Sequence, residues 1–299
     1  MEQSLKKPKV SVCVVTYNQE KYIRQCLQSI VDQKTDFDFE IIVGDDCSTD
    51  NTKAIVEEFS LKHPRIVKCI FQEKNIGASE NYLSVHEAAI GDYIAHMDGD
   101  DYCLPGKLQA QANMLDFDTG CYIVFHRMQV MTPAGEIREG PLAKVKNLAA
   151  MRFDRGAFIQ YMALGLHSSK MYRSKIREFD FPDFELIDYF VNVEQIGDGY
   201  ARYLSHENFG VYRMGVGIAS SGSKTRILLA NSFIYFNNKY PEFRAQINTA
   251  SLTYFLADLK NLRSTWRMFF LVWIKTFHVS SIFKLIRSLS FIKKLKLIN

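Results

Sequence analysis

The 299-residue chain is long enough for one large domain or two modest ones, and its 47% hydrophobic and 23% charged residues are the balance of a globular protein with a sizeable core. Nine of the 37 basic residues and none of the 33 acidic ones lie after Asp258, which leaves residues 1–258 with 28 basic and 33 acidic side chains. A mildly acidic body repels phosphate chains, so the charge pattern argues against a nucleic-acid partner.

Strands and helices are predicted to alternate over the first 125 residues. Apolar runs predict four buried strands, at 10–16, 40–44, 66–71 and 93–97. Helical spacing of apolar residues predicts a helix after each strand: one from Tyr22 to Val31, one with Asp50 as its N-cap, one over 78–89 and one entered through Pro105. Such alternation predicts an α/β fold with a mostly parallel sheet flanked by helices.

The second half of the chain is mixed and then helical. Strands are predicted near 122–131 and 167–172 and a helix near 185–196. From about Lys224 the pattern is helical to the end. The chain is therefore expected to have an α/β domain over 1–220 and a helical, basic C-terminal region over 221–299.

Polar clusters follow the predicted strands, at the edge where ligands bind in open parallel sheets. They are Thr16-Tyr17-Asn18-Gln19-Glu20, Asp45-Asp46-Cys47-Ser48, Asn75-Ile76-Gly77 and Asp98-Gly99-Asp100-Asp101. Asp45 and Asp46 suit recognition of a base or ribose, because carboxylates accept N–H and O–H donors, although they would also cap the next helix. An Asn-x-Gly turn is common by itself, but four clusters at one edge predict a site.

The acidic cluster Asp98–Asp101 is the strongest feature of the sequence. Three carboxylates within four residues repel one another unless a cation or hydrogen bonds offset the charge. Their hard oxygens suit Mn²⁺ or Mg²⁺, which in turn bind diphosphate. The alternative is a solvated acidic turn that caps a helix.

Together these motifs resemble family 2 glycosyltransferases of the GT-A fold. The matching segments are Val10–Asn18, Asp45–Asp50, Asn75–Gly77 and Met97–Asp101. The resemblance is close over 8–115 and looser over 160–220. It implies an inverting enzyme of cell-surface polysaccharide synthesis, lipopolysaccharide included, with a nucleotide-binding half at 8–120 and an acceptor half at 121–220.

The resemblance also implies roles for single residues. Thr16, Tyr17 and Asp46 match positions around the base, Asp98 matches one near the ribose or metal, and Asp100 matches the principal metal ligand. The remaining members of the clusters are expected to help bind the nucleotide sugar: Asn18, Glu20, Asp45, Asn75 and Gly77. Arg213, beside Tyr212 and ahead of glycines 215 and 217, resembles a segment near the diphosphate; the alternative is a strand end with a flexible turn.

An inverting transfer needs a base that takes the proton from the attacking acceptor hydroxyl. In the family this base is an acid at a helix start, and Phe184-Glu-Leu-Ile-Asp-Tyr189 is the matching segment. Asp188 is the predicted base, although Ile187 stands where the family usually has Glu or Gly. Glu185 and Asp183 are the fallbacks, and an exposed helix acid without a catalytic role is the alternative.

The histidines do not show a zinc-binding spacing. His96, His126 and His167 are spread over the sequence and are expected to be packed or solvent-facing residues rather than ligands. His167-Ser168-Ser169 is a candidate border of the acceptor site.

The C-terminal region combines aromatic residues with unopposed Lys and Arg. An apolar run from Trp266 to Ile274 is followed by regularly spaced basic residues. Such a segment suits an interfacial helix on an anionic membrane surface; a helical hairpin packed on the body is the alternative. The cysteines are expected to be buried thiols, and the sequence shows neither a signal peptide nor an apolar run of spanning length. The expected location is therefore the cytoplasm, at the inner face of the cell membrane.

The function expected is transfer of a sugar from a nucleoside-diphosphate donor, with a UDP-sugar preferred, to a glycan or lipid-linked acceptor. A sugar nucleotidyltransferase is one alternative, but residues 16–21 lack the Gly-rich loop typical of that class. A non-catalytic subunit with the same fold is another, and the intact acidic cluster counts against it.

Overall fold

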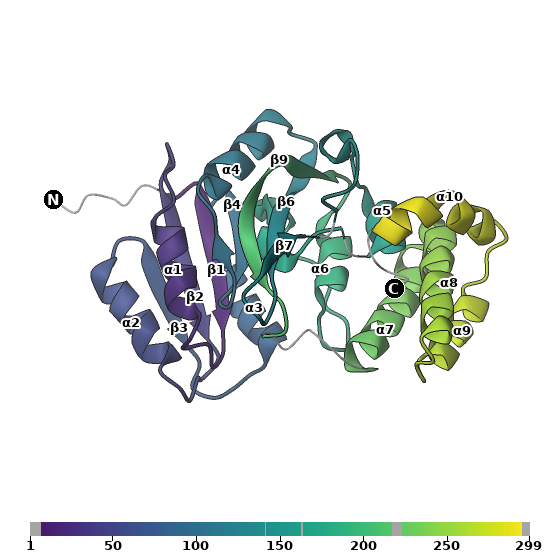
Figure 1. The fold of residues 1–299 in the computed structure, drawn as a ribbon, viewed down its shortest axis with the longest axis horizontal. Coiled ribbons are helices and arrows are strands. Elements are labelled where there is room, and N and C mark those ends of the chain that lie inside the picture. The colour runs from purple at the N-terminus through teal and green to yellow at the C-terminus, as the bar shows by residue number, and fades with distance from the viewer. Residues whose placement is uncertain (1–6, 141, 163, 217–222, 295–299) are drawn as a thin grey trace. The chain divides into compact units, whose positions relative to one another are not determined.

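The computed structural model describes residues 7–140, 142–162, 164–216 and 223–294 (Figure 1). Within them the chain forms two compact units. The sheet unit comprises residues 7–140, 165–178 and 201–216, and the helical unit comprises residues 142–162, 164, 179–200 and 223–294. Residues 142–162 and 179–200, placed by the sequence reading in the α/β domain, thus belong to the same unit as the C-terminal helices.

Four parallel strands form the first part of the sheet, in the order β3-β2-β1-β4. They are β1 Val10–Thr16, β2 Phe39–Asp45, β3 Val67–Phe71 and β4 Tyr93–Asp98. In the register, Thr16 pairs with Asp45 and Val15 pairs with Asp98. The strands therefore end level with one another, which brings the polar clusters after them to one edge.

The later strands extend the sheet with antiparallel pairs beyond β4. They are β5 Tyr102–Cys103, β6 Cys121–Met131, β7 Ile137–Glu139, β8 Met171–Arg173 and β9 Tyr200–Arg213. The order continues β4-β8-β6-β9-β5, and β7 pairs with β6. The predicted α/β class is confirmed, and the antiparallel strands return the chain to the edge where the acidic cluster lies.

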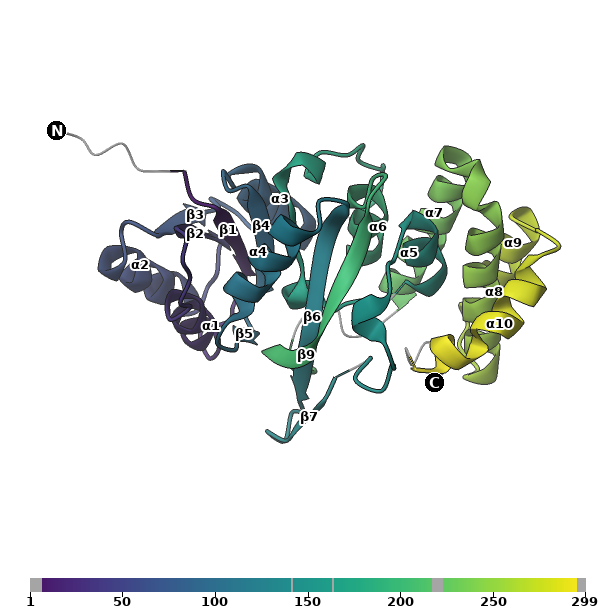
Figure 2. The same ribbon diagram turned by 90° about the horizontal axis from the view of Figure 1, so that it is seen from above.

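Helices cover both faces of the parallel strands (Figure 2). Helices α1 Ile23–Val31 and α2 Thr52–Lys62 lie on one face, and α3 Ala78–Glu87 lies on the other. Helix α4 Lys107–Phe117 packs against β6 and β8. Strands buried on both faces need continuous apolar runs, which is why β1, β2 and β4 were readable from the sequence.

One element differs in kind from its prediction. The segment expected to be a strand over 167–172 begins as a 3₁₀ turn, η2 His167–Ser169, and only then continues as β8; a second 3₁₀ turn, η3 Ser174–Ile176, follows. The turn closes through hydrogen bonds from the main-chain N–H groups of Ser169 and Lys170 to the carbonyl oxygens of Leu166 and His167. Local polar side chains favour turns over strands, and here the turn presents Ser168 to the acidic cluster.

The helical unit confirms the helical pattern predicted after residue 224, as far as the described residues extend. Its elements are η1 Leu148–Ala150, α5 Arg155–Tyr161, α6 Asp188–Gln195, α7 Ser223–Lys239, η5 Pro241–Phe243, α8 Arg244–Lys260, α9 Trp266–Lys275 and α10 Ser281–Lys294. Phe269 of α9 is fully buried and packs against Phe233 and Tyr254. Leu285 and Ile292 of α10 form a small core with Leu252 of α8.

Helices α9 and α10 and the segment that joins them also carry apolar side chains that this packing leaves exposed. They are Leu271, Ile274, Phe277, Val279, Ile282, Phe283 and Ile286, from 47% to 71% exposed. Helices α9 and α10 thus bury one face and expose another, and the membrane-interfacial segment stays a prediction. No helix in the described part of the chain is long and apolar enough to cross a bilayer.

Candidate active site

The loops after β1 and β2 are tied together by the polar residues that the sequence singled out. Asn18 donates its main-chain N–H to the Ser48 hydroxyl (2.9 Å). Its side-chain oxygen accepts the main-chain N–H of Thr49 (2.8 Å). Glu20 accepts the N–H of Asn51 at 3.0 Å. Asn51, rather than the predicted Asp50, is the N-cap residue of α2. These bonds hold Thr16 and Tyr17 between two ordered loops.

Asp45 and Asp46 are almost fully buried, at 1% and 3% exposed. Asp45 accepts the main-chain N–H of Ser48 at 3.1 Å and also its hydroxyl. Asp46 accepts the N–H groups of Ile76 (2.7 Å) and Gly77 (2.9 Å). Gly77 has φ +91°, a conformation that side chains disfavour. The Asn-x-Gly turn is therefore shaped around the Asp46 carboxylate, which links the second and third clusters.

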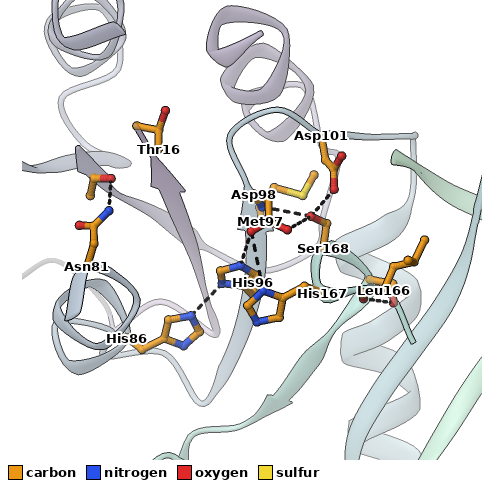
Figure 3. Close-up of polar contacts among 12 residues, drawn as sticks. Thr16, Asn81, His86, His96, Met97, Asp98, Asp101, Leu166, His167 and Ser168 are labelled. Atoms are coloured by element: carbon orange, nitrogen blue, oxygen red, sulfur yellow. Dashed lines mark hydrogen bonds and ion pairs between the residues drawn. The ribbon is translucent and has the colours of Figure 1, made fainter. Parts of the chain in front are cut away.

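The acidic cluster is ordered by residues far away in the sequence (Figure 3). Ser168 donates its hydroxyl to Asp101 Oδ2 at 2.6 Å and accepts the main-chain N–H of Asp98 at 3.0 Å. Arg213 donates its main-chain N–H to Asp101 Oδ1 at 2.9 Å. Asp101 is fully buried, so both its oxygens serve to fold the loop, and Asp98 and Asp100 are left for a ligand.

Arg213 lies at the acidic cluster, as its predicted position near a diphosphate requires. Its guanidinium donates to the main-chain oxygen of Asp100 and to Gln25 Oε1, and lies 5.0 Å from the rings of Tyr22 and Tyr102. The side chain is 8% exposed. Its charge is therefore held beside the cluster by main-chain and amide partners. Gly217, the second glycine expected after it, lies outside the described residues.

Two of the three histidines, His96 and His167, come together in space. His96 Nε2 lies 3.0 Å and His167 Nδ1 3.7 Å from Asp98 Oδ1, and the two rings stack at 3.6 Å (Figure 3). His96 and His126 are fully buried, as expected of packed residues. His167, a candidate border of the acceptor site, lies against Asp98, and its place beside an acceptor stays a prediction. The strand β4 and turn η2 bring these rings together, and no sequence spacing reveals that.

The three carboxyl groups of the cluster have different protonation tendencies. For Asp98, burial opposes ionisation, but hydrogen bonds from His167 and His96 outweigh it and hold the pKa well below the ordinary value. Burial and the charge of Asp98 raise the pKa of Asp100 to about 6. Burial and the charges of Asp98 and Asp100 raise the pKa of Asp101 well above the ordinary value. Ionised Asp100 therefore lacks compensation that a cation would supply.

The donor set of Asp98 and Asp100 fits a hard divalent cation. Asp98 is partly exposed, with 31% of its side chain accessible, and Asp100 is 5% exposed. His96, Asp98 and His167 also have ligand atoms within 4.8 Å of one another. Both ring nitrogens of His96 are already hydrogen bonded, however, so metal ligation by His96 would break a buried contact. The carboxylate pair is the better fit.

The predicted base belongs to the helical unit. Asp188 is the first residue of α6, is exposed and follows the extended N-cap residue Ile187. Of the fallbacks, Glu185 forms an ion pair with Lys224 at 2.5 Å, and Asp183 is exposed. Asp188 remains the predicted base, with Glu185 and Asp183 as fallbacks.

The chain matches the family model described as glycosyl transferase family 2 over residues 11–169, which is more than half of its length. It belongs to glycosyl transferase family 2. The matched segment holds all four polar clusters together with His96, His167 and Ser168. The matched segment thus includes the edge of the sheet described above.

Relatives and a solved structure agree with this assignment. The uncharacterized protein Rv1520 of Mycobacterium tuberculosis is 33% identical over 208 residues, covering 68% of this chain and 58% of its own length. The putative teichuronic acid biosynthesis glycosyltransferase TuaG of Bacillus subtilis is 33% identical over 129 residues, covering 43% and 50%. This family 2 chain thus spans little more than half the length of these relatives.

The chain shares its fold with a solved structure. The crystal structure of Staphylococcus aureus TarS 1–349 in complex with UDP-GlcNAc superposes with a TM-score of 0.63, covering 81% of this chain and 71% of that one at 24% identity. At this identity the likeness concerns the fold alone. The predicted GT-A-like fold is confirmed.

Several residues of this family 2 site were not singled out from the sequence. Asp101 was counted with the acidic cluster but not as the residue that folds it, and Ser168 was expected elsewhere. Lys107, fully buried at the start of α4, donates to the main-chain oxygen of Ser168 at 2.7 Å. A lysine just after a Pro-Gly turn carries no signal of burial by itself, so only its tertiary contacts reveal this role.

Proposed function

We propose that this chain is an inverting glycosyltransferase that transfers a sugar from a nucleoside-diphosphate donor to a saccharide acceptor with the help of Mn²⁺ or Mg²⁺. The observation that carries the proposal is the Asp98–Asp101 loop, level with Thr16 and Asp45 at one edge of the sheet. The first donor to test is a UDP-sugar, because TarS, which shares the fold, was solved with UDP-GlcNAc.

The nucleotide is proposed to bind over the loops after β1 and β2. Thr16, Tyr17, Asp45 and Asp46 would surround the base and ribose, supported by the interlocked main chains of the two loops. Asn18, Glu20, Asn75 and Gly77 would act mainly by shaping those loops, since their bonds join one cluster to another.

Asp98 and Asp100 are proposed to hold the cation, and Arg213 to contact the diphosphate. When bound, the cation neutralises negative charge that develops on the leaving diphosphate. Asp101 keeps the loop in shape because Ser168 and Arg213 occupy its oxygens. The four-residue loop would thus divide its carboxylates between binding and folding.

The proposed chemistry is a single displacement. Asp188 takes the proton of the acceptor hydroxyl as the acceptor oxygen forms a bond to the anomeric carbon. The bond from that carbon to the diphosphate oxygen breaks with its electron pair, and the nucleoside diphosphate leaves. The products are the inverted glycoside, the nucleoside diphosphate and the proton held on Asp188.

The acceptor is proposed to be a glycan or lipid-linked saccharide of cell-surface polysaccharide synthesis, presented at an anionic membrane surface on the cytoplasmic side. Support comes from the name of TuaG, which refers to teichuronic acid biosynthesis, and from the exposed apolar residues of α9 and α10 beside Lys275, Lys284 and Arg287. An interfacial segment near an anionic surface gains about 1 kcal/mol per basic residue.

Nucleotide release from a panel of UDP-, GDP- and dTDP-sugars, with Mn²⁺ or Mg²⁺ and with EDTA, tests the proposal. One donor should release its nucleotide only when a cation is present, and faster when a saccharide acceptor is added. Full activity in EDTA would remove the cation from the mechanism. Tight nucleotide binding with no turnover on any donor would instead identify a non-catalytic subunit.

A further inference from the structure

A chain of hydrogen-bonding groups runs from the interior of the sheet unit to Asp98. Tyr172 Oη lies 2.7 Å from His86 Nδ1. His86 Nε2 lies 3.0 Å from His96 Nδ1, and His96 Nε2 lies 3.0 Å from Asp98 Oδ1 (Figure 3). The four residues come from three elements: β8, α3 and β4. Every ring nitrogen of the two histidines is used in the chain.

These groups are shielded from solvent until the chain reaches Asp98. His86 is 2% exposed, and His96 and Tyr172 are fully buried. Tyr82 stacks on His86 at 3.8 Å and His167 stacks on His96 at 3.6 Å, so the rings cannot turn freely. Burial disfavours a charged imidazole, so both rings are expected to be neutral.

The direction of each hydrogen bond follows from one end of the chain. An ionised carboxylate can only accept, so His96 must carry its proton on Nε2. Nδ1 of a neutral His96 is then an acceptor, which requires the proton of His86 to be on Nε2 as well. Nδ1 of His86 is in turn an acceptor, and the Tyr172 hydroxyl donates to it. With both imidazoles neutral, this arrangement of protons satisfies all three contacts.

We propose that Tyr172, His86 and His96 form a buried donor relay that holds the His96 ring with its Nε2–H towards Asp98 and thereby positions the Asp98 carboxylate for the cation. The inference rests on the proposed function, because it assigns the relay a purpose only if Asp98 holds the metal. None of the three residues touches the ligand; each is a positioning residue that acts through the next.

The relay would matter because a metal ligand held in place before binding needs no reorganisation. His96 fixes Asp98 Oδ1, and the Ser168 hydroxyl, whose proton goes to Asp101, accepts the main-chain N–H of Asp98, so Asp98 is held through both its side chain and its main chain. Hydrogen-bond partners of metal ligands typically change metal affinity by about 10–100-fold when they are removed. Tyr172 and His86 would contribute by anchoring Nδ1 of His96 through the hydrogen-bond chain, which keeps the His96 ring oriented towards Asp98.

The tautomers can be measured on the unmodified protein without metal. Long-range ¹H–¹⁵N spectra of histidine-labelled protein in EDTA should show His86 and His96 neutral and protonated on Nε2, assigned by loss of each signal in His86→Gln and His96→Gln. Protonation of either ring on Nδ1 would overturn the relay, whatever the enzyme does.

Mn²⁺ affinity, measured by electron paramagnetic resonance of the free ion, tests the positioning role. His96→Leu should weaken Mn²⁺ binding by about 10–100-fold, and His96→Gln, which keeps a donor for Asp98, should restore most of it. Tyr172→Phe should weaken it less, because it acts two bonds away. His126→Leu and Tyr93→Phe are matched controls outside the relay, a buried histidine and a strand tyrosine bonded to Asp116, and should leave affinity unchanged.

Asp100→Ala separates this inference from the proposed function. If Asp100→Ala abolishes Mn²⁺ binding while His96→Leu leaves it intact, the cation site stands and the relay's positioning role is overturned. If the unmodified protein binds no Mn²⁺, the cation site fails and the positioning role falls with it. Equal loss in His96→Leu and His126→Leu would identify a packing effect and would also overturn the role.

Discussion

At the scale of single residues, neighbouring carboxylates in this chain have separate tasks because their partners differ. Both carboxylate oxygens of Asp101 accept hydrogen bonds, from Ser168 and Arg213. Asp98 is hydrogen bonded by His96, and Asp100 is buried beside the charge of Asp98. The same division holds for Asp45 and Asp46, which bind different loops. A carboxylate's role is thus set by which donors reach it, and charge by itself does not define it.

Asp100→Asn is predicted to abolish the cation's effects while the fold persists. The amide keeps the side chain's shape but removes a negative ligand, so transfer should fall by about 10²-fold or more, as loss of several kcal/mol of charge stabilisation implies. Mn²⁺ should raise the melting temperature of the unmodified protein and not of the variant. Asp92→Asn, which loses only an exposed ion pair with Lys7, is the control. A Mn²⁺-induced shift that survives in Asp100→Asn would contradict the ligand assignment.

Asp188→Asn is predicted to uncouple donor binding from transfer. Removing the proton acceptor should lower turnover by about 10²-fold or more, with the dissociation constant of the nucleotide unchanged. Glu185→Gln is the matched variant, because its carboxylate is paired with Lys224 and should be dispensable. Isothermal titration of the nucleotide and single-turnover rates measure the two effects. The reverse pattern, with Glu185→Gln inactive, would move the base to Glu185.

At the scale of elements, register and face decide what the side chains can do. The parallel pairing of β1 with β2 and β4 puts Thr16, Asp45 and Asp98 at one level. In α10 the residues at helical spacing that face α8 are buried, Leu285 and Ile292 among them, whereas Phe283 and Ile286 are exposed. One helix therefore contributes both to a core and to an apolar surface that carries Lys284 and Arg287.

Loss of that surface is predicted to remove membrane binding without unfolding the protein. Combined Leu271→Ser, Phe283→Ser and Ile286→Ser exchanges side chains that are 57% to 65% exposed, so stability should change little. Sedimentation with anionic liposomes should be lost, whereas the unmodified chain should bind at low salt and be partly released at high salt. Leu61→Ser, 83% exposed in the sheet unit, is the control. Equal sedimentation of the triple variant would retire the membrane proposal.

At the scale of the whole molecule, the two compact units separate the predicted functions. Binding residues from Thr16 to Arg213 lie in the sheet unit, and Asp188 and the basic helices lie in the helical unit. The helical unit depends on its last helices: Asp258, fully buried, is bonded by Arg226 and Thr265, and Phe269 fills its core.

Truncation after Asp258 is therefore predicted to destabilise the protein and not merely to release it from membranes. It removes Phe269 and the α10 side chains that pack on α8, exposing apolar surface. Phe269→Ala reproduces part of this loss and should cost about 3–5 kcal/mol. Melting curves and urea titrations of both variants, with Leu262→Ala (90% exposed in the unmodified chain) as control, measure it. A truncated protein that melts like the full chain would contradict this packing role.

The sequence by itself determined the elements and the edge of the sheet where chemistry gathers. Continuous apolar runs such as Val10–Thr16 can only be strands buried on both faces, and the clusters after them must share an edge because parallel strands point the same way. The motifs were local enough to reveal the family. The tertiary structure decided which distant residues come into contact. Ser168 and Arg213 bond directly to the acidic cluster, from up to 113 residues away, and His86 and Tyr172 connect to it through His96. Hydrogen bonds depend on positions in space, and three imidazoles that looked unrelated along the chain stack beside Asp98 because β4, α3 and η2 pack together.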